Sequence, residues 1–275
     1  MTDLYPKKED IVYKTINGTD LHLDLIFPKQ ISKPCPCAVF IHGGGWFIGA
    51  RKDVWGFPLI IDALIEQGII VASVEYRLVH KNGGGFPQSV EDTLDALQFI
   101  DRDIPEIDPQ RKAVWGISAG GYMALMCALY QDPNRTPSPI KAILDMCGPT
   151  YLKGNDPRFP QSDMPQETQG YIRDLIGESP DIPNYNPICL LHAAPQKPAL
   201  MIVHGQLDEC VPTEQSRQLY MQAQKEGFFA QYLEVEHGGH IFHSRDGQPI
   251  RPKTQDLMHQ MSSFLITHLT SSTID

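Results

Sequence analysis

The 275-residue sequence lacks any apolar run long enough to cross a membrane. Its most apolar stretches are short and stop at glycine or at charged residues, whereas a transmembrane helix needs about 20 apolar residues. The first ten residues, MTDLYPKKED, also lack the apolar core and the small-residue cleavage site of a secretory signal. We therefore expect a cytoplasmic protein without a membrane partner.

Positive charge is scarce as well. The chain carries 23 Lys and Arg against 33 Asp and Glu, which gives a formal net charge of −10. An acidic surface repels the phosphate backbone of nucleic acids, so the charge balance argues against a nucleic-acid partner. It says little else, because net charge bears on solubility and steering rather than on fold.

The six cysteines show no metal-binding spacing. Apart from Cys35 and Cys37, which flank a proline, they are scattered, and no pair of CxxC units suggests a zinc site. Such cysteines are typical of reduced thiols in a cytoplasmic protein.

Strands of two kinds are predicted along the chain. Residues 21–27 alternate in polarity, residues 11–16 are their expected partner, and Asn17-Gly18 between them is a strong hairpin signal. Continuous apolar runs predict further strands that are covered on both faces. These runs lie at residues 38–41, 69–74, 113–115, 142–144 and 199–203, and residues 230–235 are expected to form the last strand.

Helical segments lie between these strands. They cover residues 53–67, 87–102, 119–131 and 213–227, and a last helix covers residues 253–269. This alternation is typical of an α/β fold with a mostly parallel sheet and helices on both faces, and the length fits one domain over residues 1–275. Residues 149–198 depart from this alternation of strands and helices, because nine of them are proline and only a short helix around Gln169–Ile176 is predicted. We interpret this insertion as a lid or pocket wall.

The strongest chemical signal is the motif Gly116-Ile117-Ser118-Ala119-Gly120, between a predicted strand and a predicted helix. A serine in a sharp strand-to-helix turn is an exposed nucleophile, and side chains two residues to either side would clash, which explains both glycines. We interpret Ser118 as a nucleophile rather than as a serine that only caps a helix.

A second signal is His42-Gly43-Gly44-Gly45-Trp46, directly after a predicted buried strand. Glycines let backbone N–H groups approach a substrate, so Gly44, Gly45 and, beyond the serine, Ala119 are expected to form an oxyanion hole. A phosphate-binding loop is disfavoured, because neither a GxGxxG pattern nor a GKS or GKT ending is present. His42 itself is expected to hold the loop by hydrogen bonds.

With these two motifs the chain resembles the α/β-hydrolase superfamily. More narrowly, it resembles the esterases with an HGGG motif, which include the hormone-sensitive lipase group and small carbohydrate-ester and feruloyl-type esterases. The resemblance runs from about Ile11 to the C-terminus and implies an α/β-hydrolase fold. The short segment before the first strand favours the compact carbohydrate-esterase-like branch. Further matching stretches are Glu75-Tyr76-Arg77-Leu78, Phe86-Pro87 with Asp92, and Asp108-Pro109.

A serine hydroxyl needs a neighbouring base, and the base needs a carboxylate to orient it. In this family the acid follows the serine along the chain and the histidine comes last. Asp208 follows the predicted strand 199–203 in a stretch that resembles the family's acid loop, so we predict it to be the acid, with Glu209 as its rival.

His240 is the predicted base. It follows the last predicted strand, with Gly239 before it and Phe242 shortly after it, as in the family pattern. His237 and His243 are the other candidates, and both are interpreted as solvated loop residues.

The predicted reaction is hydrolysis of a small carboxylic ester. Ser118 attacks the ester carbonyl while His240 takes its proton, Asp208 orients His240, and water then hydrolyses the acyl-enzyme. This chemistry needs no metal and no organic cofactor. The expected partner is the small-molecule ester, and monomer and homodimer both remain open.

Specificity is harder to predict. Trp46, Trp55 and Tyr122 are candidates for a substrate pocket, because they lie near the glycine loop or the serine; core packing is the alternative for each. Further aromatic candidates are Phe47, Tyr151, Phe159, Tyr171 and Tyr185. The general prediction is that the substrates are short-acyl esters. The more specific prediction is that they are acetylated sugars or acetylated xylan fragments.

Two alternatives remain open. An arylformamidase-type amide hydrolase would use the same three residues, although that group often has an aromatic residue where this chain has Gly45. A non-catalytic ligand receptor of the same fold commonly loses one of the three, and here candidates for all three are present.

Overall fold

The described residues form an eight-stranded sheet. The computed structural model describes residues 4–31, 33–153, 164–177 and 184–271. The strands lie side by side in the order β1-β2-β4-β3-β5-β6-β7-β8. Their bounds are β1 (Lys7–Ile16), β2 (Thr19–Ile26), β3 (Cys35–Ile41), β4 (Ile70–Val74), β5 (Ile107–Ile117), β6 (Ile140–Met146), β7 (Ala199–Gly205) and β8 (Ala230–Val235).

The first two strands form an antiparallel edge. β1 pairs with β2 around Asn17 and Gly18, whose φ values of 49° and 75° are those of a tight hairpin turn. β2 also pairs antiparallel with β4, and the remaining neighbours from β4 to β8 are parallel. The predicted N-terminal hairpin on a mostly parallel sheet is confirmed.

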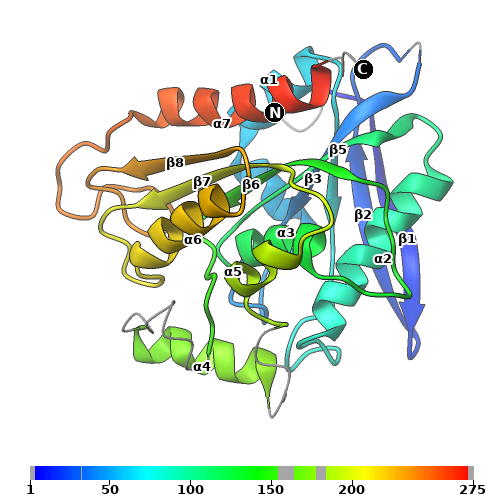
Figure 1. Cartoon of the computed structure of the whole chain (residues 1–275). Helices are drawn as coiled ribbons and strands as arrows, with labels where there is room; N and C mark the ends of the chain where they lie inside the picture. Colours follow the sequence, from blue (N-terminus) through cyan, green and yellow to red (C-terminus); the bar gives the residue numbers. More distant parts are fainter. Residues whose placement is uncertain (1–3, 32, 154–163, 178–183, 272–275) are drawn as a thin grey trace.

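Helices cover both faces of this sheet (Figure 1). α1 (Pro58–Glu66) and α7 (Thr254–Thr270) pack together on one face. α2 (Gln88–Asp103), α3 (Ala119–Leu129) and α6 (Glu214–Lys225) cover the other. Among the described residues, none of the helices has both the length and the apolar character needed to cross a bilayer.

Short helical elements occupy the connections. They are η1 (Arg51–Gly56), α4 (Gln166–Ile176), α5 (Pro187–Leu190) and η2 (Leu191–Ala193). The predicted helix 53–67 is divided into η1 and α1, because Pro58 starts a new helix, where its missing N–H costs nothing. The short helix predicted around Gln169–Ile176 is present as α4.

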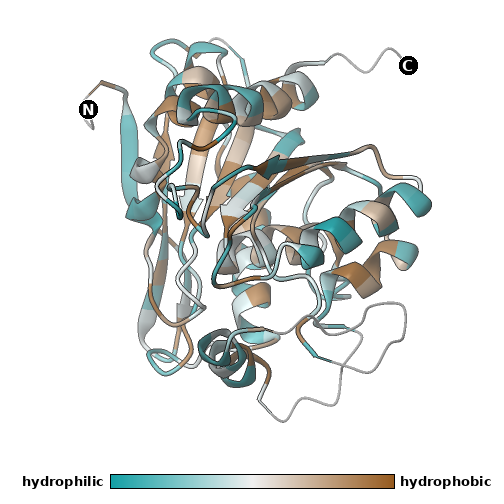
Figure 2. Ribbon diagram, turned by 90° about the vertical axis from the view of Figure 1, so that its left-hand side faces the viewer, coloured by the Kyte–Doolittle hydropathy of each residue, from teal (hydrophilic) through white to brown (hydrophobic). Residues whose placement is uncertain are grey.

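Three inner strands of the sheet are buried along their whole length. Every residue of β3, β4 and β7 is buried, which explains their continuous apolar runs. Figure 2 shows the same contrast, since the inner strands are largely hydrophobic whereas the edge strand near the N-terminus is hydrophilic. The sheet divides the core into two apolar clusters, one under each layer of helices.

One acidic residue interrupts this core. Asp145 on β6 is fully buried, and its Oδ1 accepts the backbone N–H of Gly148 at 3.0 Å. Its Oδ2 has no hydrogen-bond partner among the described residues. Burial raises the pKa of Asp145 to about 8, against the opposing effect of the Gly148 hydrogen bond. Asp145 is therefore a neutral carboxylic acid at neutral pH.

Asp145→Asn should gain stability relative to the wild type as the pH rises from about 5 to about 7.5. The unfolded chain releases the Asp145 proton near pH 3.9, so in this window only the folded state holds it, and the free energy of unfolding falls by about 1.4 kcal/mol per pH unit. Asparagine does not titrate and escapes this loss. Denaturant unfolding across the pH range measures the difference.

The part-exposed variant Asp108→Asn is the matched control. Burial acts to raise the pKa of Asp108, but hydrogen bonds from Arg111 and from the Gln110 N–H lower it, so Asp108 is ionised in both states across the window. Because arginine does not titrate in this window either, the effect of Asp108→Asn should not grow with pH. A stability difference between Asp145→Asn and the wild type that stays constant across the window would contradict the buried neutral acid.

Candidate active site

Ser118 lies in the tight turn between β5 and α3. Its φ and ψ are 57° and −123°, a region that residues with a side chain rarely adopt. A Cβ on Gly120 would lie 2.0 Å from the carbonyl oxygen of Ile41, and one on Gly116 would lie 2.4 Å from the carbonyl oxygen of Gly120. Both glycines are therefore required for the turn to pack against the end of β3.

Ser118, His240 and Asp208 form one chain of hydrogen bonds. Nε2 of His240 lies 2.8 Å from Oγ of Ser118, and Nδ1 of His240 lies 2.7 Å from Oδ2 of Asp208. The three residues come from the loops after β5, β8 and β7, whose parallel strands end at the same edge of the sheet. The structure thus brings together the three side chains singled out in the sequence.

The Asp208 carboxylate is buried but well supplied with donors. Its side chain has no exposed surface, and Oδ1 accepts the backbone N–H groups of Cys210 and Val211, both at 2.8 Å. Burial acts to raise the pKa of Asp208, yet the hydrogen bonds from His204 and His240 hold that pKa well below its usual range. Asp208 therefore stays ionised and can stabilise an imidazolium.

His240 is held by its backbone as well as by its ring. The backbone N–H donates to Oε2 of Glu209 at 3.2 Å, and the backbone carbonyl accepts the thiol of Cys147 at 3.0 Å. Burial disfavours the charged imidazolium, but the Asp208 carboxylate beside the ring raises the pKa of His240. Glu209 thus supports the loop of His240 and does not contact the ring, which leaves Asp208 as the partner of Nδ1.

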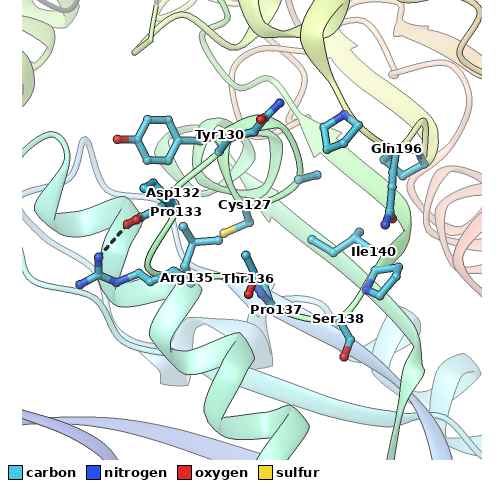
Figure 3. A pocket seen from close by; sticks show the side chains of 16 residues that line it. Cys127, Tyr130, Asp132, Pro133, Arg135, Thr136, Pro137, Ser138, Ile140 and Gln196 are labelled. Carbon is cyan, nitrogen blue, oxygen red and sulfur yellow. Dashed lines mark hydrogen bonds and ion pairs between the residues drawn. The ribbon is translucent and has the colours of Figure 1, made fainter.

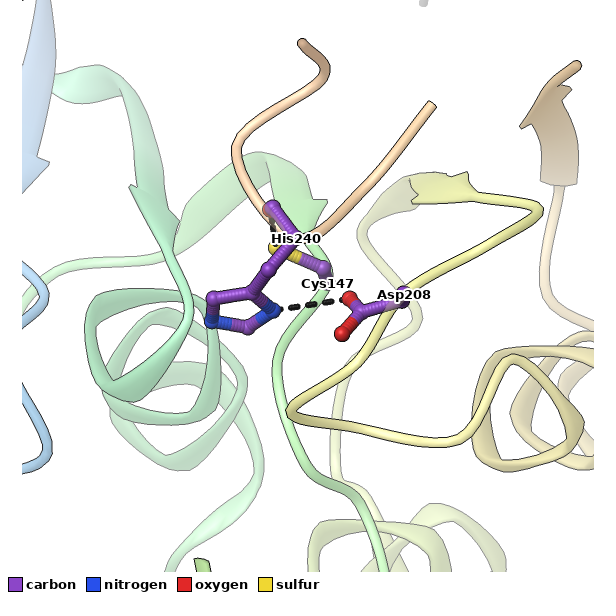
Figure 4. A group of neighbouring side chains, drawn as sticks. All are labelled: Cys147, Asp208 and His240. Atoms are coloured by element: carbon purple, nitrogen blue, oxygen red, sulfur yellow. Dashed lines mark hydrogen bonds and ion pairs between the residues drawn. The ribbon is translucent and has the colours of Figure 1, made fainter. Parts of the chain in front are cut away.

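Cys147, Asp208 and His240 also form a group of possible metal ligands (Figure 4). Their donor atoms lie within 4.8 Å of one another, and thiolate, carboxylate and imidazole are ligands that zinc accepts. However, burial raises the pKa of the Cys147 thiol, so it stays protonated, and Nδ1 of His240 already donates to Asp208. The arrangement fits a hydrogen-bond chain better than a metal centre.

The other two histidines lie in the same loop. His237 pairs with Asp246 through Nδ1 at 2.8 Å, and its side chain is 32% exposed. His243 accepts the backbone N–H of Gly239 with its carbonyl oxygen, and the residue is exposed. Both fit the predicted solvated loop positions.

The glycine loop lies beside Ser118. Gly44 and Gly45 have φ values of 102° and 59°, and the Gly44 carbonyl accepts the N–H groups of Phe47 and Ile48 at 3.2 and 3.1 Å. Within the described part of the chain, the N–H groups of Gly44, Gly45 and Ala119 donate to no acceptor. They are therefore free to receive a developing oxyanion.

His42 supports this loop from below. It is buried, stacks on Tyr76 with ring centroids 4.4 Å apart, and donates Nδ1–H to the carbonyl oxygen of Gly43 at 2.8 Å. Burial lowers the pKa of His42, so the ring stays neutral. A Cβ on Gly49 would lie 2.4 Å from this Nδ1, so the chain can fold back over His42 only at a glycine.

A cavity of about 370 Å³ opens on Ser118 and His240. The glycine loop, α4 and the loop after β7 form its walls, and the lining is mostly apolar. The insertion contributes Pro149, Pro165, Glu167, Thr168 and Tyr171 to this lining. Among the described residues that line it, Glu167 and Glu209 are the acidic ones.

Of the aromatic residues predicted to line the pocket, some point into the cavity and others point into the core. Trp46 lines the cavity, but Tyr122 is fully buried behind it, with ring centroids 5.2 Å apart and its hydroxyl donating to the Tyr185 carbonyl at 3.2 Å. Trp55 belongs to η1 and packs against the core under α1 and α7. The prediction that Tyr122 and Trp55 line the pocket is therefore corrected.

The further aromatic candidates divide in the same way. Phe47 and Tyr171 line the cavity and contact each other with ring centroids 4.7 Å apart. Tyr151 and Tyr185 belong to the buried core. Phe159 lies outside the described residues.

A larger cavity, of about 500 Å³, lies at the opposite edge of the sheet, between the end of α3 and the starts of β6 and β7 (Figure 3). Arg135 is already paired there with Asp95 and Asp132, both at 2.7 Å. None of the described residues that line it is a histidine, and burial raises the pKa of the Cys127 thiol. Of these two cavities, only the one at Ser118 joins a nucleophile to a base.

Among the comparisons with known proteins, one family model matches most of the chain. The BD-FAE family model matches residues 23–223. The non-reducing polyketide synthase stbA of Stachybotrys bisbyi is 33% identical over 161 residues, which are 55% of this chain and 7% of that synthase. The chain therefore spans less than a tenth of the length of such synthases.

Solved structures resemble the whole chain. Thermogutta terrifontis esterase 2 phosphonylated by sarin has a TM-score of 0.77 at 21% identity, over 99% of this chain and 98% of that one. A truncated carbohydrate esterase from gut microbiota has a TM-score of 0.74 at 21% identity, over 98% and 99%. These likenesses confirm the fold expected from the sequence.

Gly120→Ala should destabilise the protein strongly. The new methyl group meets backbone at both Ile41 and His42, so strand and helix must separate, and overpacking of this kind costs about 1–3 kcal/mol or more. Thermal and denaturant unfolding measure the loss.

Gly170→Ala is the matched control. Gly170 lies inside α4 with nothing within 4 Å of an added Cβ, so alanine should stabilise the helix by about 0.5–1 kcal/mol. Equal effects of the two substitutions would show that the contact at Ile41 is not the constraint.

Proposed function

Because the chain belongs to the BD-FAE family of esterases with the α/β-hydrolase fold, we propose that it hydrolyses small carboxylic esters through Ser118, His240 and Asp208. The observation that carries this proposal is the unbroken hydrogen-bond chain from Oγ of Ser118 to Asp208, at the floor of a cavity of about 370 Å³. A receptor that only binds a ligand would need neither this alignment nor free N–H groups beside it.

The reaction begins at Ser118. Nε2 of His240 removes the hydroxyl proton as Oγ attacks the ester carbonyl, and the ionised Asp208 stabilises the imidazolium that forms. The charge on the carbonyl oxygen is received by the N–H groups of Gly44, Gly45 and Ala119; one such donor is typically worth about 10²–10³ in kcat. The imidazolium then protonates the leaving alcohol.

Deacylation repeats these roles with water. His240 removes a proton from water, which attacks the acyl group on Ser118, and the collapse of the second tetrahedral intermediate restores the serine hydroxyl. Every proton in this cycle moves through Nε2 of His240, so the mechanism needs no metal and no organic cofactor.

We propose that the substrates are esters of short acyl groups with hydroxyl-rich alcohols. More specifically, we propose acetylated sugars or acetylated xylan fragments. Glu167 and Glu209 disfavour anionic substrates and accept hydrogen bonds from hydroxyl groups. Tyr171, whose hydroxyl donates to Glu167, and Phe47 offer aromatic faces next to these acceptors. The likeness to a carbohydrate esterase supports the same class of substrate.

Ser118→Ala should lose p-nitrophenyl acetate hydrolysis by about 10⁴-fold or more while it keeps the wild-type unfolding temperature, because the attacking oxygen is gone. A fluorophosphonate probe should label the wild type at Ser118 and leave the variant unlabelled. Ser138→Ala, in the second cavity, is the control and should retain activity. An inactive wild type, or an active Ser118→Ala, would contradict the proposed function.

The value of kcat/KM should depend on the length of the acyl chain. We expect the highest kcat/KM for acetyl to butyryl esters and a fall of roughly tenfold or more for lauroyl esters, because a cavity of this size holds only a short acyl chain beside the alcohol. A p-nitrophenyl ester series, acetylated xylosides and a formyl amide compare the classes. If the formyl amide reacts faster than every ester, the arylformamidase alternative replaces this proposal.

A further inference from the structure

A second histidine, His204, contacts the carboxylate of Asp208. His204 lies on β7, is fully buried, and is not among the residues that line the cavity. Its Nε2 lies 3.0 Å from Oδ2 of Asp208, the same oxygen that accepts Nδ1–H of His240 at 2.7 Å. Two imidazole rings thus meet at one carboxylate oxygen, and only one of them reaches Ser118.

The partners of His204 define which ring nitrogen carries the proton. Nε2 also lies 2.9 Å from the carbonyl oxygen of Val211, which can only accept, so Nε2 must be the donor. Nδ1 lies 2.6 Å from Oγ of Ser216, a buried hydroxyl on α6 that can donate to it. The single Nε2–H of His204 is therefore shared between the Val211 carbonyl oxygen and Oδ2 of Asp208.

These contacts leave the Asp208 carboxylate no freedom to turn. Oδ1 accepts two backbone N–H groups and Oδ2 accepts two imidazole N–H groups, so rotation about the last side-chain bond would break all of them. β7 and α6, which hold His204, belong to the packed core and give the contact a rigid base.

We propose that His204 is a positioning residue: its Nε2–H holds Asp208 in line with His240 and takes a share of the charge on Oδ2. This inference rests on the proposed function, since it assigns how the acid of that site is oriented. A donor that shares Oδ2 weakens the pull of the carboxylate on the His240 proton, so His204 also sets how basic His240 is.

The pair His204→Asn and His204→Gln separates this role from simple packing. The glutamine amide nitrogen reaches the position of Nε2 and can still donate to Asp208, whereas the asparagine amide reaches only the position of Nδ1, beside Ser216. For p-nitrophenyl acetate we expect kcat to fall between about tenfold and a hundredfold in His204→Asn, with KM within about twofold of the wild type. His204→Gln should restore kcat to within about threefold of the wild type.

The pH profile provides a readout that packing alone would not move. Without the His204 donor, more of the Oδ2 charge acts on His240, the pKa of His240 rises, and the acid limb of kcat/KM moves to higher pH. The limb should return to its wild-type position in His204→Gln. In an Asp208→Asn background, His204→Asn should add almost no further loss of kcat, because both changes act through the same carboxylate.

Several results would overturn the positioning role. They are a folded His204→Asn with wild-type kcat and acid limb, a folded His204→Gln as impaired as His204→Asn, and losses that simply add in the Asp208→Asn background. An inactive wild type would instead overturn the proposed function, so the two failures are distinguishable.

Imidazole proton spectra cover the case in which His204→Asn does not fold. The wild type should show protected imidazole N–H resonances from His204 and His240, in addition to that of the buried His42, and the resonances of His204 and His240 should shift in Asp208→Asn. A shift of the His240 resonance alone would contradict the contact between His204 and Asp208.

Discussion

The contact between Gly120 and the end of β3 is the constraint on which the rest of the site depends. With only 2.0 Å between a hypothetical Cβ on Gly120 and the Ile41 carbonyl oxygen, α3 can start there only at a glycine. The chain must then turn sharply at Ser118, which accounts for the positive φ of that residue. The close packing of the start of α3 against the end of β3 also brings the glycine loop beside the first turn of α3. The nucleophile Ser118 and the N–H groups expected to bind the oxyanion therefore lie next to each other. β7 and β8 continue the parallel order of the sheet, so the loops that follow them place Asp208 and His240 at the same carboxyl ends of the strands.

Two buried carboxylates show how the number of donors decides charge. Asp145 and Asp208 both have fully buried side chains. Asp145 receives one N–H, and burial raises its pKa, so it stays neutral. Asp208 receives two backbone N–H groups and two imidazole N–H groups, which hold its pKa low although its side chain is buried as well. The chemistry of the site therefore depends on the loop geometry around Asp208 as much as on the presence of an acid.

Features with a local cause could be predicted from the sequence, and features set by side-chain direction could not. The apolar runs of β3 and β7 are read correctly because both faces of these strands are covered. The positions of Ser118, Asp208 and His240 relative to their strands follow from motif and chain order. Trp55 and Tyr122 lie close in sequence to site residues but point into core clusters, and nothing in their local sequence shows this. The role of His204 was not predicted, because it follows the predicted strand 199–203 in a stretch that was used only to locate the acid, although its spacing of four residues from Asp208 was a signal.

The central claim is that Ser118 carries an acyl group during turnover. The most direct measurement is to quench a reaction of the wild type with p-nitrophenyl acetate in acid within its first turnover and to map the acetylated peptide by mass spectrometry. The account predicts an acetyl group on Ser118 that disappears once substrate is exhausted. Acetyl transfer to another residue, or an active enzyme that never accumulates an acetyl group on Ser118 even in a variant with slowed deacylation, would contradict it.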